Sequence, residues 1–160
     1  MAHEHSLGPD IQLRRMTSRN KAVAGLIERL GYVFKDEQLL EQALTHASGA
    51  KSKVAGSNER LEFLGDRVLG LVVAQLLYEQ HEDLPEGDLA RMLNTLVPRQ
   101  TCAKLGEKRG IPDALVLAGK GNKRTVVTEN MVGDACEALL AAVYLDGGLA
   151  AAHSVIGEHW

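Results

Sequence analysis

Apolar residues recur at intervals of three and four along most of this chain, which is the spacing of amphipathic helices. No stretch alternates between apolar and polar residues in the way that a half-buried strand does. Aromatic residues make up only 4% of the sequence, so Leu, Val and Ala must fill the core, and these residues favour helices. We therefore expect an all-α fold, with helices at residues 19–30, 35–47, 58–79, 84–97, 99–109, 128–144 and 150–160.

The helix expected at residues 58–79 has one acidic face. At 100° per residue, Glu59, Glu62 and Asp66 lie within about 60° of one another. Acids at this spacing repel each other and do not stabilise a helix, whereas a divalent cation binds where carboxylate oxygens converge. A solvated acidic face is the alternative interpretation. The opposite side carries the apolar residues that we expect to be buried, namely Leu61, Leu64, Val68, Leu71 and Val72.

The first turn of this helix has two further features. Ser57 or Asn58 precedes it and is suited to cap it. Phe63 does not lie with the other apolar residues, because it is about 40° from Glu59 on the helical wheel. A monomer would expose this ring beside charged groups. We therefore expect Phe63 to contact a partner, most simply in a two-fold dimer.

A second pair of acids lies in the helix expected at residues 128–144. Asp134 and Glu137 are spaced i, i+3 and point away from the apolar stripe of that helix. Cys102 and Cys136 are expected to be packed in the core. His46, near the end of an earlier helix, is expected to be a hydrogen-bonded structural residue, with a ligand or general base as the alternative.

Composition limits the type of protein. With 160 residues the chain is expected to form one domain after a flexible leader at residues 1–18. Its net charge of -3 predicts no strong nonspecific attraction to nucleic acid, although Lys120, Lys123 and Arg124 form a basic loop with glycines that can contact RNA or be merely solvated. Two cysteines, no signal peptide and no expected membrane span predict a cytoplasmic protein.

Several motifs together resemble a known family. The nine residues Asn58 to Asp66 read NERLEFLGD, and other stretches occur in the same order and spacing as in that family. The chain resembles the endonuclease domain of bacterial ribonuclease III over roughly residues 20–160. The further matching stretches are Leu44-Thr45-His46, Glu86-Gly87-Asp88, and Asp134-x-x-Glu137-Ala138-Leu139 leading to Tyr144-Leu145-Asp146-Gly147-Gly148.

The resemblance implies a homodimeric helical fold and a role for each matching acid. By position, the metal ligands would be Glu62, Asp66, Asp134 and Glu137, the catalytic residues Asp66 and Glu137, the accessory acids Glu59, Glu86 and Glu129, and the dimer contact Phe63. It also implies Mg²⁺, with Mn²⁺ as a substitute. The implied reaction is cleavage of double-stranded RNA to 5′-phosphate products with short 3′ overhangs, in rRNA and mRNA processing.

The sequence departs from the family pattern in three places. The loop at residues 119–128 is short, Gly133 replaces the usual Ala, and the chain ends at Trp160, where family members usually continue into a double-stranded-RNA-binding domain. We therefore expect an isolated catalytic domain at residues 19–160, with low, salt-sensitive RNA affinity. Two alternatives are a catalytically silent RNA-binding relative and an all-α nucleotide pyrophosphatase, whose second acidic pair would lie closer in sequence.

Overall fold

The computed structural model describes residues 17–50, 56–118 and 125–160. Within these ranges the regular structure is helical, and the extended pairing consists of an isolated bridge between Thr45 and Val116. The predicted all-α fold is therefore confirmed. The helices are α2 (Ser18–Leu30), α3 (Glu37–Ala43), the 3-10 helix η1 (Ala47–Gly49), α4 (Glu59–Gln80), α5 (Glu86–Leu96), α6 (Arg99–Arg109), α7 (Ile111–Ala114) and α8 (Glu129–His159).

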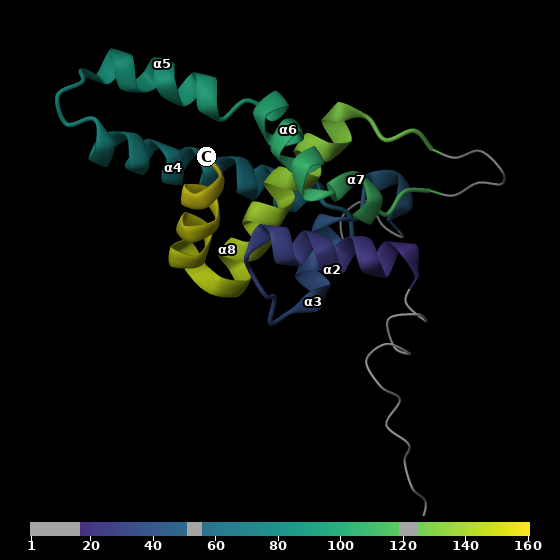
Figure 1. Ribbon diagram of the computed structural model, residues 1–160. Helices are drawn as coiled ribbons and strands as arrows, with labels where there is room; N and C mark the ends of the chain where they lie inside the picture. The colour runs from purple at the N-terminus through teal and green to yellow at the C-terminus, as the bar shows by residue number, and fades with distance from the viewer. Residues whose placement is uncertain (1–16, 51–55, 119–124) are drawn as a thin grey trace, which may run out of the picture.

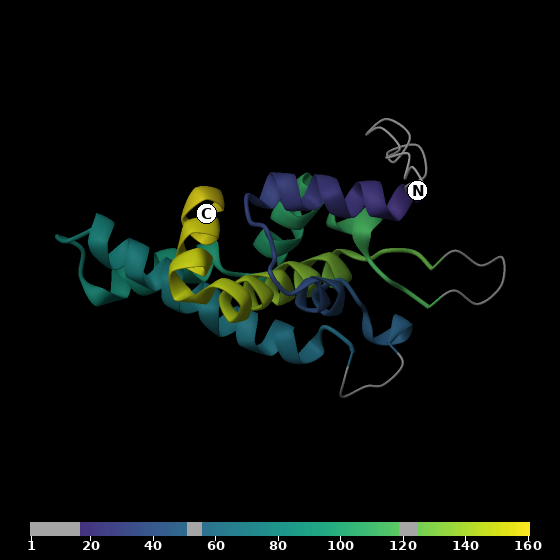
Figure 2. The ribbon, with the colours of Figure 1, turned by 90° about the horizontal axis from the view of Figure 1, so that it is seen from below.

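Helix α8 is the centre of the molecule (Figures 1 and 2). It lies between α4 on one side and α2, α6 and α7 on the other, while α3 also packs against it. Helix α5 runs back along α4 and extends away from the other helices. The chain turns at Gly148, which has φ 82° and ψ 179°, so the last part of α8 takes a different direction. This arrangement surrounds the first half of α8 with protein.

Burial explains the apolar character of α8. Its first half is buried on nearly every side, including Ala135, Leu139 and Val143 of the predicted stripe. By length and composition, α8 is the one helix among the described residues that could cross a membrane. A core helix has the same composition because it too is surrounded by apolar groups. The packing of α8 against α4 and α6 accounts for its sequence without a membrane.

Helix α4 is rotated relative to the predicted orientation. Leu61, Val68 and Val72 are buried as predicted, but Leu71 is 56% exposed and Leu69 is fully buried instead. Leu64, the remaining member of the predicted set, is partly buried. The side of α4 that faces α8 therefore includes Leu69, and the prediction for Leu71 was wrong. Helical periodicity gives the angles between side chains but not the direction from which the neighbouring helix approaches.

The ends of several helices are set by specific residues. As predicted, α2 ends at Gly31, which adopts the left-handed conformation with φ 72° that glycine accommodates without strain. Helix α3 is shorter than the predicted 35–47 helix, because the backbone after Ala43 extends to pair with Val116. The Asn58 side chain does not cap α4. It is 2% exposed and donates to the Ala43 carbonyl oxygen at 3.3 Å.

Candidate metal centre

The candidate site lies where α4 crosses α8, and a glycine allows the crossing to be close. A Cβ atom built on Gly65 would collide with the backbone carbonyl group of Glu137. With hydrogen in place of a side chain, the two backbones can approach at this point. Acidic residues on both sides of the crossing are thereby brought to one place.

Three carboxylates from the two helices converge there. Glu62 of α4 and Asp134 and Glu137 of α8 each present an oxygen atom within 4.8 Å of the others' oxygens. Glu137 is only 5% exposed. Glu137 is buried although it lies off the apolar stripe of α8, because α4 covers that side of the helix. Burying an acid in this way is costly unless a cation or proton compensates its charge.

The surroundings of Glu137 favour its neutral form when no cation is bound. Burial raises the pKa of the Glu137 carboxyl above its ordinary value of 4.5, and the negative charges of Asp66, Glu62 and Asp134 also raise it. The positive charge of Arg99 opposes these effects, and the resulting pKa is about 7. A bound divalent cation would instead favour the ionised form of Glu137, since it stabilises the carboxylate.

Glu62 and Asp134 share one basic partner, Arg99, at the beginning of α6. The Arg99 Nη2 donates to Glu62 Oε1 at 3.2 Å, and its Nε lies 2.9 Å from Asp134 Oδ1. Burial raises the pKa of both carboxyl groups. The charge of Asp134 raises the pKa of Glu62 further, whereas Arg99 lowers both pKa values. Arg99 thus offsets part of the repulsion among the acids.

One oxygen atom in this group is left without a hydrogen bond. Asp134 Oδ1 is buried and, among the described residues, no donor is directed at it. Its 2.9 Å approach to Arg99 Nε is an ion pair by distance only. Buried carboxylate oxygens are normally satisfied, and hard divalent cations prefer oxygen ligands. The unsatisfied oxygen and the neighbouring carboxylates therefore fit a divalent cation.

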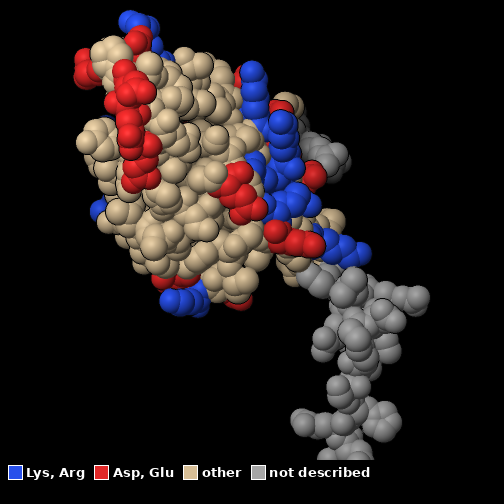
Figure 3. Space-filling view, turned by 60° about the vertical axis from the view of Figure 1, so that its left-hand side comes forward, with Lys and Arg blue, Asp and Glu red and all other residues tan. Residues whose placement is uncertain are grey.

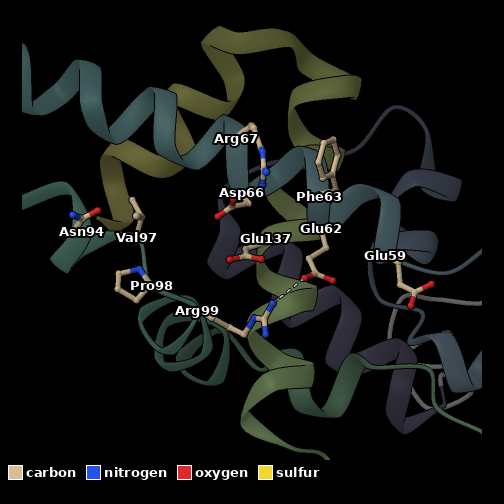
Figure 4. A pocket seen from close by; sticks show the side chains of 10 residues that line it. All are labelled: Glu59, Glu62, Phe63, Asp66, Arg67, Asn94, Val97, Pro98, Arg99 and Glu137. Atoms are coloured by element: carbon tan, nitrogen blue, oxygen red, sulfur yellow. Dashed lines mark hydrogen bonds and ion pairs between the residues drawn. The ribbon is translucent and has the colours of Figure 1, made fainter. Parts of the chain in front are cut away.

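The remaining predicted residues of α4 lie around this group (Figure 4). A pocket of about 550 Å³ is lined by Glu59, Glu62, Asp66 and Glu137, among others. Asp66 lies beside Glu137, and Arg67 Nη1 donates to its Oδ2 at 2.5 Å. The Glu59 carboxylate is exposed and points away from Glu62 and Glu137. Glu62 and Asp66 thus lie close to Glu137, whereas Glu59 lies at the periphery of the site.

Other predicted site residues are not part of this group. Glu86 is exposed at the first residue of α5, and Glu129 is exposed at the first residue of α8. Neither lines the pocket or belongs to the converging carboxylates. The predicted RNA contacts Lys120, Lys123 and Arg124 lie outside the described residues. His46 is hydrogen-bonded to Ser48 through Nδ1 at 2.8 Å, as expected of a structural histidine.

Comparison with known proteins identifies the family. A family model described as Ribonuclease-III-like matches residues 36–160. The chain belongs to this family. Ribonuclease 3 of Phenylobacterium zucineum is 46% identical over 147 residues, which cover 91% of this chain and 62% of that protein. Ribonuclease 3 of Brucella canis is 44% identical over 151 residues, covering 91% of this chain and 60% of that protein.

A solved structure supports the same assignment. The nuclease domain of ribonuclease III from Campylobacter jejuni, described with structural flexibility in a region involved in dimer formation, is 32% identical to this chain. The match has a TM-score of 0.75 and covers 86% of this chain and 98% of that one. The chain therefore has the fold of a ribonuclease III nuclease domain, and spans about three fifths of the length of the curated relatives it matches.

Membership of the ribonuclease-III-like family was expected from the sequence, but two contributors to the site were not. Arg99 follows Pro98 at the start of α6, and only the packing of α6 on α8 brings it to Glu62 and Asp134. Gly65 belongs to the nine-residue signature, yet its contact is with a residue far along the chain. A glycine between acids in a long amphipathic helix is the signal that could have indicated a close crossing.

Proposed function

We propose that this chain is the catalytic domain of a divalent-metal-dependent endoribonuclease that cleaves double-stranded RNA. The observation that carries the proposal is the convergence of Glu62, Asp134 and Glu137 at the α4–α8 crossing. Family membership and relatives named ribonuclease 3 support this choice of reaction. The expected products have 5′-phosphates and short 3′ overhangs, and the expected role is rRNA and mRNA processing in the cytoplasm.

The residues of the site would have distinct roles. Glu62, Asp66, Asp134 and Glu137 would hold Mg²⁺, or Mn²⁺ in its place, because hard cations select carboxylate oxygens. When bound, such an ion lowers the pKa of an attacking water and stabilises negative charge on the phosphate. Asp66 and Glu137 are the proposed catalytic pair, beside each other in the pocket. Glu59, Glu86 and Glu129 would be accessory acids that support the cleavage site.

We further propose that two copies associate through the outer face of α4. Phe63, Leu71 and Tyr78 are 66%, 56% and 74% exposed, and on a helical wheel they lie within about 80° of one another. Figure 3 views a face of the molecule on which most Lys and Arg lie toward the right and a row of Asp and Glu lies at the upper left, whereas the exposed apolar residues of α4 are those named above. Exposed apolar surface of this kind favours association, and a two-fold dimer makes it self-complementary.

A neighbouring groove supports Phe63 as the anchor of that dimer. Its pocket has a volume of about 650 Å³ and is lined mostly by apolar residues, with Gln42, Glu59 and Arg60 as its polar members; the apolar residues are Leu39, Leu61, Leu64, Leu145 and Phe63 itself. An aromatic ring that enters such an apolar pocket is a common hot spot in interfaces. In the proposed dimer, each copy would offer both the ring and the groove. Two metal sites would then face one double-stranded RNA, which proteins recognise by shape and phosphates.

The test is cleavage of long double-stranded RNA in the presence of Mg²⁺. The wild-type protein should cut it and the Glu137→Ala variant should not, while Glu107→Ala, at an exposed acid on α6, should cut at the wild-type rate. The circular dichroism spectra of both variants should remain helical. Analysis of the product ends tests the expected 5′-phosphates and overhangs.

Each alternative predicts a different outcome of this assay. A silent RNA-binding relative would bind the RNA and leave it intact, and a nucleotide pyrophosphatase would consume nucleoside triphosphate instead. Equal cleavage by the wild-type protein and the Glu137→Ala variant would contradict the assignment of the site.

A further inference from the structure

Arg99 is a basic residue that lies among the acids of the candidate metal site, although the proposed reaction does not require it. It is the first residue of α6, preceded by Pro98 with φ -58° and ψ 150°. From there its guanidinium reaches between the acids, with Nη2 3.2 Å from Glu62 Oε1 and Nε 2.9 Å from Asp134 Oδ1 (Figure 4 shows the contact with Glu62). Among the described residues, no other Lys or Arg forms an ion pair with either of these acids.

Gly133 in α8 leaves space for Arg99 because it has no side chain. A Cβ atom at Gly133 would lie 2.6 Å from Arg99 Cγ and 2.9 Å from the Arg99 carbonyl oxygen. Any other residue at position 133 would therefore push back both the stem of Arg99 and the start of α6. This contact accounts for a glycine at position 133, where the family resemblance led us to expect alanine. Arg99 is thus held in place by packing as well as by charge.

The oxygens that Arg99 contacts are the ones that a cation would need. Glu62 and Asp134 belong to the group whose ligand atoms lie within 4.8 Å of one another. The contact with Asp134 Oδ1 is an ion pair without a hydrogen bond, so the oxygen keeps its lone pairs free for another partner. A guanidinium and a metal ion close to the same carboxylates repel each other.

We propose that Arg99 is an internal counter-ion that competes with the divalent cation for Glu62 and Asp134, and so sets the metal affinity of the site. This inference rests on the proposed metal-dependent function. Without metal, Arg99 offsets the repulsion among the buried acids and keeps the α4–α8 crossing stable. When metal binds, Arg99 gives up these contacts. Arg99 is therefore a positioning residue, and its presence weakens metal binding while it protects the metal-free fold.

Direct titration with Mn²⁺ tests the proposal without measuring cleavage. Free Mn²⁺ is followed by electron paramagnetic resonance in the wild-type protein and in Arg99→Gln, which keeps a long polar side chain but loses the charge. Arg99→Gln should bind Mn²⁺ about tenfold more tightly, because one positive charge close to the ion is removed. Arg99→Lys, which retains the charge, should bind close to the wild-type affinity.

A matched control separates this local effect from net charge. Arg91 is an exposed arginine on α5 that pairs with Asp88, so Arg91→Gln removes the same charge away from the site. Its Mn²⁺ affinity should equal that of the wild-type protein. A second readout is thermal unfolding. Mn²⁺ should raise the melting temperature of Arg99→Gln more than that of the wild-type protein, because the variant binds the ion more tightly and has no Arg99 contacts to give up when the ion binds.

The outcomes distinguish this inference from the function on which it rests. If wild-type protein binds Mn²⁺ and Arg99→Gln binds it equally or more weakly, the competition does not exist. The same conclusion follows if Arg99→Lys binds as tightly as Arg99→Gln, since the retained charge would then have no effect. If the wild-type protein takes up no Mn²⁺, the proposed metal site itself is wrong.

Discussion

Replacing Glu137 by Gln should stabilise the metal-free protein at alkaline pH. The carboxyl group of Glu137 is 5% exposed, and burial, followed by the charges of Asp66 and Glu62, raises its pKa from 4.5 to about 7. The folded protein therefore keeps this proton up to about pH 7, whereas the unfolded chain releases it near the ordinary value. Unfolding releases a proton between these two pH values, so the stability of the wild-type protein falls as pH rises through that window.

The size of the effect follows from the two pKa values. Above about pH 7 the ionised, buried Glu137 costs at most about 3 kcal/mol relative to its neutral form. Gln has nearly the same shape and cannot ionise, so the variant should not incur this loss. The two proteins should have similar stability at about pH 4, and Glu137→Gln should be the more stable by up to about 3 kcal/mol at about pH 8.5.

Urea unfolding followed by circular dichroism, with a chelator present, measures this difference at the two pH values. Glu107→Gln is the matched control, because Glu107 is an exposed acid on the neighbouring helix α6. Its stability relative to the wild-type protein should not change with pH. A stability difference between Glu137→Gln and wild type that is the same at both pH values would refute the reasoning, because the effect would then not come from ionisation of Glu137.

Addition of Mg²⁺ should remove most of the stability difference between the two proteins at about pH 8.5. A ligand at 100 times its dissociation constant stabilises the folded state by about 2.7 kcal/mol. The wild-type protein should gain this stabilisation, since metal binding requires the ionised Glu137 carboxylate. The neutral amide of Glu137→Gln is a poorer ligand, so the variant should gain much less. Equal stabilisation of both proteins by Mg²⁺ would show that Glu137 is not a ligand.

Three further substitutions test the fold and the proposed dimer. Gly65→Ala should lower the free energy of unfolding by about 1–3 kcal/mol or more, because the added Cβ collides with the Glu137 carbonyl group; native stability in urea would contradict the close crossing. Asp146→Asn should destabilise the protein at neutral pH but not at low pH. Two backbone N–H groups and Tyr32 Oη donate hydrogen bonds to the Asp146 carboxylate and lower the pKa of this carboxyl group. The contribution of the ionised carboxylate to stability is therefore lost as the pH falls through that pKa. Phe63→Ala should weaken self-association by about tenfold or more in analytical ultracentrifugation; unchanged sedimentation at low concentration would exclude Phe63 from the interface.

Local features of the fold were predictable from the sequence because they depend on neighbouring residues. The end of α2 at Gly31 follows from the left-handed conformation that glycine adopts, and the burial of Cys102 and Cys136 follows from their apolar surroundings. The convergence of Glu62 with Asp134 and Glu137 was anticipated through the family motifs, since spacing within one helix cannot reveal a contact with a second helix.

The predictions failed where tertiary contacts decide the outcome. Leu71 shares the helical periodicity of buried residues, but α8 approaches α4 from the side of Gly65 and Leu69 and leaves Leu71 exposed. Asn58 is a favourable cap by residue type, yet its amide is used for the Ala43 carbonyl oxygen on α3. In both cases the residue satisfies a longer-range packing requirement that no local pattern contains.

Helix α4 has three sides with different roles: packing against α8, the metal site and the exposed surface. Its inner side, with Gly65 and Leu69, fixes the distance to α8 and so determines how deeply Glu137 is buried. The acid at Glu62 lies beside this contact, while Phe63 is on the exposed side. A change on the inner side should therefore alter the stability and the metal site together, because both depend on the same helix separation. A change at Phe63 should leave the monomer fold intact and act on association alone.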